Sequence, residues 1–194
     1  MSVFRWTAPL FKLVARRWSE DDLRVIANLL RPYVAAGGVF ADLGGGTGDL
    51  GAGIARVLGA RVIIVDPTPE MLRRVDAHPL VSVQLAGAER LPFPAAHFDA
   101  VLCCDAFHHF RDQDAAAREL VRVLRPGGGV LILEAEATGG SRPWAVFERI
   151  LGEPAGFRTA AGLEEFFASY GIVGTSARQK GTSYIFVGAF RPSP

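Results

Sequence analysis

Cysteine is scarce in this chain, because Cys103 and Cys104 are the only two among 194 residues. They are adjacent within an apolar run, and strand geometry would point neighbouring side chains to opposite faces of a sheet. We therefore expect no disulfide between them and a reduced, cytoplasmic setting. The N-terminus has scattered charges and no apolar segment like that of a signal peptide, which argues against secretion.

An excess of charge and long apolar runs are also lacking. The 21 basic and 20 acidic residues are interspersed and leave a net charge of +1, so no basic patch for nucleic acid is expected. No apolar run approaches the roughly 18 residues that a membrane-spanning helix needs. Hydrophobic residues, in contrast, make up 49% of the chain, which is enough for a core covered by helices. A length of 194 residues fits one domain.

Short β-branched runs alternate with helical stretches from residue 39 onward. Continuously apolar runs predict buried parallel strands, and apolar positions at helical spacing predict the helices between them. The predicted strands are Val39–Leu43, Arg61–Asp66, Val81–Leu85, Ala100–Cys104 and Val130–Glu134, and the predicted helices are Leu50–Leu58, Pro69–Ala77 and Asp114–Leu124. This alternation predicts an α/β fold with a Rossmann-like, doubly wound and mostly parallel sheet.

Capping and stop signals agree with these helices. Thr68 can cap one helix with Pro69 at its first position, and His78-Pro79 can stop it. Asp112 can cap the next helix, which Arg125-Pro126-Gly127 would end.

The pattern changes after Glu134. Arg142–Leu151 and Leu163–Tyr170 predict short helices, and Val173–Lys180 and Tyr184–Phe190 predict an antiparallel hairpin joined at Gly181, at the edge of the sheet. We find no repeat or flexible linker, and so expect one domain. It would comprise a helical lead-in over residues 1–35, a ligand-binding half over 36–134, and a short cover with the edge hairpin over 135–194.

Aromatic and basic side chains are mixed in the lead-in. Such a stripe suits core packing, a lid over a substrate, or a helix on a membrane surface, and the sequence leaves these open. The residues concerned are Phe4, Trp6, Leu10, Phe11, Val14 and Trp18, with Arg5, Lys12, Arg16 and Arg17.

The most informative segment is the glycine-rich loop Asp42-Leu-Gly-Gly-Gly-Thr-Gly48, between the first predicted strand and helix. Glycines let the backbone approach a ligand closely. Gly46-x-Gly48-x-x-Gly51 satisfies the dinucleotide fingerprint, in which a helix N-terminus faces a pyrophosphate. Asp42 and Asp49 flank the loop, however, and two carboxylates would repel a pyrophosphate but suit a ligand with an ammonium and a sulfonium group. A tight turn with a buried capping Asp is the structural alternative.

Asp66 ends the second predicted strand. A carboxylate there can accept both hydroxyls of a ribose, as it does in nicotinamide enzymes. Asp66 therefore indicates an adenosine-type ligand without choosing between cofactors. Pro67 and Met71 would then lie near the adenine, although Met71 also suits a helix core.

Four further stretches carry a family resemblance: Gly45-Gly-Thr-Gly-Asp-Leu50, Ala88-Glu-Arg-Leu-Pro-Phe-Pro94, Arg122-Val-Leu-Arg-Pro-Gly-Gly128 and Leu131-Ile-Leu-Glu134. With the Asp42 loop, they resemble the class I S-adenosylmethionine-dependent methyltransferases, in particular the ubiquinone/menaquinone-biosynthesis C-methyltransferases. The likeness covers about residues 39–134. It implies a seven-stranded sheet, S-adenosylmethionine as cofactor, no metal, and a small-molecule methyl acceptor such as an aromatic or quinone-like compound.

The resemblance also implies the cofactor site. Thr47, Asp66, Gly87–Ala88 and Cys104 align with the family's cofactor contacts. Gly87 stands where these relatives usually carry Asp or Asn, so the adenine contact must come from the backbone or from another residue. The complete expected cofactor site is Asp42, Gly44, Gly46, Thr47, Gly48, Asp66, Pro67, Gly87, Ala88, Cys104 and Asp105.

Asp105-Ala-Phe-His-His-Phe110 follows the fourth predicted strand, where the family places groups near the transferring methyl. Methyl transfer needs mainly an in-line approach and a dry pocket, and a base only if the acceptor must lose a proton. His108 and His109 are the candidates for that base, with a structural turn role as the alternative. Asp105 is a candidate for the cofactor pocket or for a cap.

Departures from the family limit the inference about the substrate. His108-His109 replaces the family's Arg-Asn, and the stretch between Glu134 and the final hairpin is shorter, so the resemblance does not extend to the residues that would select a quinone. Two rival functions also stay open at this point. One is a nicotinamide-dependent oxidoreductase, and the other is a cofactor-binding subunit without activity.

Overall fold

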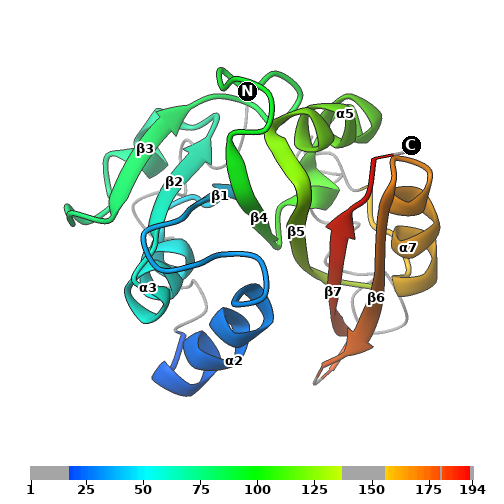
Figure 1. The fold of residues 1–194 in the computed structure, drawn as a ribbon, viewed down its shortest axis with the longest axis horizontal. Coiled ribbons are helices and arrows are strands. Elements are labelled where there is room, and N and C mark those ends of the chain that lie inside the picture. Colours follow the sequence, from blue (N-terminus) through cyan, green and yellow to red (C-terminus); the bar gives the residue numbers. More distant parts are fainter. Residues whose placement is uncertain (1–17, 137–155, 180, 193–194) are drawn as a thin grey trace.

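A single seven-stranded sheet in the order β3-β2-β1-β4-β5-β7-β6 forms the centre of the computed structural model, which describes residues 18–136, 156–179 and 181–192 (Figure 1). Strands β1 to β5 pair in parallel, and β7 runs antiparallel to both β5 and β6. The strands are β1 Val39–Leu43, β2 Arg61–Asp66, β3 Val81–Leu85, β4 Phe98–Cys104, β5 Leu124–Ala135, β6 Ile172–Arg178 and β7 Ser183–Phe190. The predicted doubly wound, mostly parallel sheet with a C-terminal antiparallel hairpin is therefore confirmed.

Helices cover both faces of this sheet (Figure 1). On one face, α2 (Glu20–Leu30) packs on α3 (Asp49–Leu58), and both contribute to a core with the side chains of β1 and β2 that point to this face. On the other face, α5 (Gln113–Val123) and α7 (Ala160–Ala168) bury a second core that is rich in phenylalanine. This two-faced burial explains why the central strands read as continuous apolar runs.

Local sequence signals fix where these helices begin. Ser19 and Asp22 form a reciprocal capping box at the start of α2. The predicted Asp112 cap is confirmed, since its side chain accepts the Ala115 N–H at 2.8 Å at the start of α5. Thr159 caps α7 in the same way, so the helix starts slightly before the predicted Leu163.

The predicted helix Pro69–Ala77 is wrong in its length, because α4 spans only Pro69–Leu72. Beyond Leu72 the turn tightens, and the Val75 N–H donates to the Leu72 carbonyl at 3.2 Å. This turn places Val75 against the glycine loop, where its Cγ1 lies 3.2 Å from the position of a Cβ built on Gly48. The helix therefore ends where Val75 packs onto the glycine loop, several residues before Pro79.

Strand β5 begins earlier than predicted. Leu124 already pairs with Phe98 of β4, and the register then shifts so that Gly129 pairs with Ala100. The intervening Arg125-Pro126-Gly127 stretch forms this irregularity, and Arg125 makes an ion pair of 2.6 Å with Asp99. It follows directly on the end of α5 at Val123.

Cys103 and Cys104 are both free and pack against opposite faces of the sheet, as predicted. No helix in the described ranges is long and apolar enough to cross a membrane. The predicted helix Arg142–Leu151 and the aromatic, basic stretch before Trp18 lie outside the described residues.

Candidate cofactor and active site

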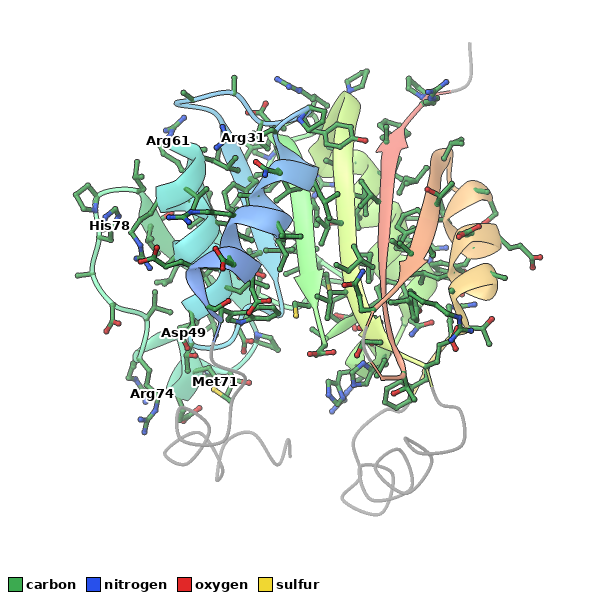
Figure 2. The ribbon with its side chains drawn as sticks, turned by 90° about the horizontal axis from the view of Figure 1, so that it is seen from below. Arg31, Asp49, Arg61, Met71, Arg74 and His78 are labelled. Atoms are coloured by element: carbon green, nitrogen blue, oxygen red, sulfur yellow. The ribbon has the colours of Figure 1, made fainter. Side chains whose placement is uncertain are left out.

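A cavity of about 430 Å³ opens at the carboxyl ends of β1, β2 and β4. Figure 2 shows Asp49 and Met71, which both line it, at the end of the sheet opposite Arg61, the first residue of β2. The chain runs from β1 through β2 and β3 towards one edge of the sheet, and then returns to β4 on the other side of β1. A doubly wound sheet binds its ligand where the strand order reverses in this way. The predicted cofactor residues in the lining are Asp42, Gly44, Gly46, Thr47, Asp66, Pro67, Gly87, Ala88, Cys104 and Asp105.

Gly48 and His108 are the two predicted site residues that do not line the cavity. Gly48 instead precedes α3 in a left-handed conformation, with a φ of 77°. Such a conformation favours glycine, so Gly48 shapes the turn and does not line the cavity.

Close packing around the loop also depends on glycine. A Cβ on Gly44 would lie 2.5 Å from Ala106 Cβ, in the turn that follows β4. A Cβ on Gly51 would lie 2.5 Å from Asp42 Oδ2. The missing side chains therefore bring the β4 turn and the Asp42 carboxyl directly against the loop.

The Asp42 carboxyl is buried, with 2% of the residue exposed, and its Oδ2 has no hydrogen-bond partner in the part of the chain described. Burial raises its pKa to about 7, an effect that the Gly51 N–H opposes and the charge of Asp66 increases. A buried acceptor without a donor, beside a cavity, suits a cationic ligand. The ammonium or sulfonium group of S-adenosylmethionine fits this requirement.

Asp66 connects two segments of the cavity wall. Its Oδ2 accepts the Gly46 N–H at 3.0 Å, and its Oδ1 accepts the Thr68 N–H at 2.8 Å. Burial raises the pKa of Asp66, and these two N–H bonds and a hydrogen bond from the Thr68 hydroxyl oppose the effect. Each carboxylate oxygen can accept more than one hydrogen bond, so both remain able to accept a ribose hydroxyl.

Replacing Asp66 tests this assignment. We expect Asp66→Ala to weaken binding of S-adenosylhomocysteine about tenfold to a hundredfold, because a charge-assisted hydrogen bond contributes roughly 1.5–3 kcal/mol. Isothermal titration of the folded variant measures the change. Asp21→Ala, which removes an exposed carboxylate from α2, is the matched control and should bind as the parent does. Unchanged affinity in Asp66→Ala would place the ribose elsewhere.

Side chains of α5 hold the part of the cavity wall that follows β3 in the chain. Arg122 donates to the carbonyls of Leu91 and Phe93 at 2.9 and 2.7 Å, and Glu119 accepts the Leu91 N–H at 2.6 Å. These bonds fix the Leu-Pro-Phe turn that follows the cavity-lining residues 86–89. The turn is recognisable in the sequence, but the Arg122–Glu119 pair that anchors it is not, because the partners lie about 30 residues apart.

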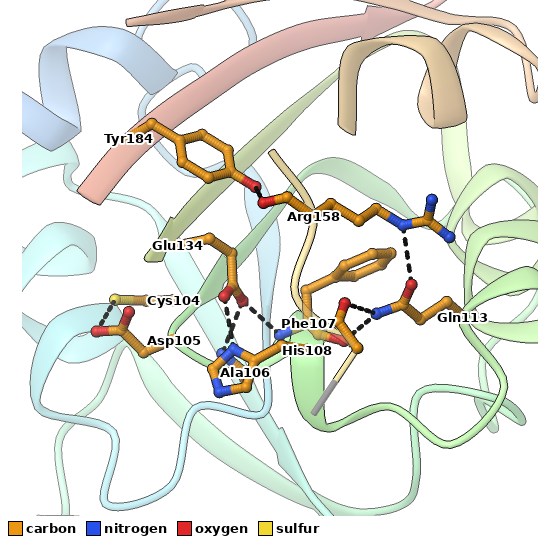
Figure 3. A network of polar contacts seen from close by, with 10 residues as sticks. Cys104, Asp105, Ala106, Phe107, His108, Gln113, Glu134, Arg158 and Tyr184 are labelled. Carbon is orange, nitrogen blue, oxygen red and sulfur yellow. Dashed lines mark hydrogen bonds and ion pairs between the residues drawn. The ribbon is translucent and has the colours of Figure 1, made fainter. Parts of the chain in front are cut away.

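Glu134, at the end of β5, organises the turn after β4 (Figure 3). Its Oε1 accepts the N–H groups of Ala106 and Phe107 at 3.1 and 2.8 Å, and its Oε2 lies 2.5 Å from His108 Nδ1. This role was missed by sequence reasoning, although a carboxylate at the end of a fully buried strand was a usable signal.

The structure separates the two candidate histidines. His108 is only 5% exposed and stacks on Phe157 with 4.1 Å between ring centroids, so its ring belongs to the scaffold under the turn. His109 lies beside it, with 4.0 Å between their ring centroids, and lines the cavity together with Asp105 and Phe110. Of the two, only His109 is placed to reach a molecule in the cavity.

Asp105 also faces the cavity and adopts a φ of 47°, which is uncommon for a residue other than glycine. The Cys104 thiol lies 3.8 Å from its Oδ2. Burial and the charge of Asp105 raise the pKa of Cys104 well above its ordinary value, so this thiol stays neutral and is no nucleophile.

Comparison with known proteins agrees with this geometry. Residues 41–132 match the family described as "Methyltransferase domain". The ubiquinone/menaquinone biosynthesis C-methyltransferase of Chromobacterium violaceum is 41% identical over 108 residues, which is 52% of this chain and 44% of that protein. The chain thus matches less than half the length of this relative.

Two solved structures share the fold over nearly the whole chain. One is a putative methyltransferase of Haloferax volcanii in a complex with the Trm112 methyltransferase activator; it is 18% identical, with a TM-score of 0.80 and 99% of each chain covered. The other is a possible histamine N-methyltransferase of Thermotoga maritima, also 18% identical, with a TM-score of 0.76 over 97% of this chain and 98% of that one. Residues 41–132 therefore match a methyltransferase domain, a family whose cofactor is S-adenosylmethionine, and the sheet order and the cavity agree with that match.

Proposed function

We propose that this protein transfers the methyl group of S-adenosylmethionine to a small aromatic or quinol-like acceptor. The observation that carries the proposal is the convergence of two kinds of residue in one cavity. Asp42 and Asp66 supply buried acceptors for a cationic nucleoside at one side, and His109 and Phe110 stand at the other.

Each residue has a role in this proposal. The Asp42 carboxylate faces the cofactor's positive charge, and Asp66 accepts the ribose hydroxyls. The cofactor supplies an electrophilic methyl group on a sulfonium. His109 takes the proton that the acceptor's hydroxyl or acidic carbon gives up as the methyl arrives. Glu134, through three hydrogen bonds to the turn, keeps His109 at the cavity.

The side chains near His109 support an aromatic acceptor. Phe110 and Trp18 both line the cavity, and aromatic faces favour a flat, apolar ligand. The similarity to ubiquinone/menaquinone biosynthesis C-methyltransferases points to the same class of compound. A quinol precursor is therefore the first acceptor to assay, and phenols are the second.

Ligand-induced stabilisation tests the cofactor half of the proposal. S-adenosylhomocysteine at about a hundred times its Kd should stabilise the folded protein by roughly 2.7 kcal/mol, or about 5–11 °C in Tm for a chain of this size. NAD at the same concentration should leave Tm unchanged, because two carboxylates beside the glycine loop disfavour a pyrophosphate. Equal shifts with the two ligands would remove the methyltransferase proposal and favour an oxidoreductase.

Methyl transfer itself separates an enzyme from a cofactor-binding subunit. Incubation with methyl-labelled S-adenosylmethionine and a set of quinols and phenols should give a labelled organic-soluble product. Tight binding of S-adenosylhomocysteine without any labelled product, in this set or in a cell lysate, would instead favour the non-enzymatic subunit.

A further inference from the structure

A carboxylate without an assigned role stands in the cavity wall beyond β3. Glu89 is half-buried and lines the cavity beside Gly87 and Ala88. Its Oε1 accepts the Arg111 N–H at 3.0 Å, which links it to the turn after β4. Its Oε2 lies 2.9 Å from the position that a Cβ on Gly87 would occupy.

The backbone does not require glycine at position 87. Its φ lies outside the left-handed region, so any side chain could be accommodated there conformationally. The neighbour that a Cβ would meet is the carboxylate of Glu89. The space beside Gly87 is thus occupied by an acidic group that comes from two residues further along the chain.

Strand order determines which part of the cofactor reaches this wall. Strand β2, with Asp66 at its end, lies between β1 and β3. A ligand whose ribose is bound at Asp66 and whose cationic end lies at Asp42 must extend its base towards the residues that follow β3. Adenine presents an exocyclic amino group there, which is a hydrogen-bond donor.

We propose that Glu89 makes this site specific for adenine, by accepting a hydrogen bond from the exocyclic amino group through Oε2. The Arg111 N–H engages Oε1 and so determines which oxygen faces the base. Glu89 thereby supplies the acceptor that Gly87 cannot provide. This inference rests on the proposed cofactor site, with the ribose at Asp66.

Binding of two ligands that differ at this edge of the base tests the inference. S-inosylhomocysteine carries an oxo group in place of the amino group and a hydrogen on N1, and so presents an acceptor where adenine presents the amino donor. By isothermal titration, the parent protein should prefer S-adenosylhomocysteine about tenfold to a hundredfold. In Glu89→Gln the amide oxygen keeps the Arg111 N–H and the amide nitrogen faces the base, so the preference should vanish or reverse. Glu165→Gln, on the exposed side of α7, should keep the parental preference.

A second variant distinguishes recognition of the base from support of the turn. Glu89→Ala should lose the preference, and adding Gly87→Asp to it should restore the preference by returning a carboxylate to the same space. A merely structural Glu89 would not be replaced in this way. Parental selectivity in Glu89→Gln, or no restoration by the second change, would overturn the inference. Failure of the parent to bind S-adenosylhomocysteine would instead overturn the proposed function.

Discussion

The His109→Ala variant should lower the rate of methyl transfer by about two to four orders of magnitude, the usual contribution of a general base. We expect this loss because His109 lines the cavity at the turn after β4 and can contact an acceptor there. Affinity for S-adenosylhomocysteine should change only a few-fold, since the proposed contacts to the cofactor come from Asp42 and Asp66. Single-turnover transfer to the assigned acceptor measures the chemical step. Imidazole added to the variant should recover part of the rate, which a structural defect would not allow.

His108→Ala is the matched comparison, one residue away. Its ring contacts Glu134 within the scaffold, and removal leaves a buried carboxylate without one partner. Losing a packed aromatic ring and its buried hydrogen bond costs about 3–5 kcal/mol, or roughly 6–20 °C in Tm for a chain of this length. We expect this loss in thermal unfolding, with a smaller effect on the transfer rate of the protein that remains folded. A full rate in His109→Ala, or a selective rate loss with unchanged Tm in His108→Ala, would contradict the assignment.

The fold was predictable because its signals are local. Burial on both faces of the sheet requires continuous apolar runs such as residues 62–65 of β2, and side-chain caps such as Asp112 act within one helical turn. The glycine loop was predictable for the same reason, since its conformation and its flanking carboxylates lie within a few residues of one another.

What sequence reasoning missed depends on partners that are distant in the chain. Glu134 reaches the turn at His108 across 26 residues, and Glu89 reaches Arg111 across 22. No periodicity or spacing reports such contacts, so the two histidines could not be separated and Glu89 received no role. The early end of α4 at Leu72 has the same origin, because Val75 packs on Gly48.

Cofactor affinity should rise steeply with pH, because of the state of Asp42 in the free protein. Its pKa of about 7 means that the buried carboxyl is mostly protonated at pH 6. In the proposed site the ammonium group, which S-adenosylhomocysteine shares with S-adenosylmethionine, favours the ionised carboxylate, so binding below pH 7 releases the proton. Affinity for S-adenosylhomocysteine should therefore increase by up to about tenfold per pH unit between pH 5 and 7, and level off above it.

Titration in buffers of different ionisation enthalpy counts the released proton. We expect about 0.9 protons released per ligand at pH 6 and about 0.1 at pH 8, from the pKa of about 7. Asp42→Asn should bind more weakly at pH 8 and lose most of this pH dependence. Flat affinity in the parent, or an unchanged proton release in the variant, would remove Asp42 from the cofactor's charged end.

The same pKa shift has an opposite effect on the stability of the free protein. Because the folded-state pKa lies above the unfolded value of about 3.9, the folded protein holds more protons between the two values. The contribution of Asp42 to the free energy of unfolding is fully present below pH 4 and is lost as the pH rises through 7, by up to about 4 kcal/mol. Unfolding by urea at pH 5 and pH 8 should show this fall in the parent and a smaller one in Asp42→Asn. Saturating S-adenosylhomocysteine should reduce the fall in the parent, since its ammonium group stabilises the ionised carboxylate, and a fall unaffected by the ligand would show that the two do not interact.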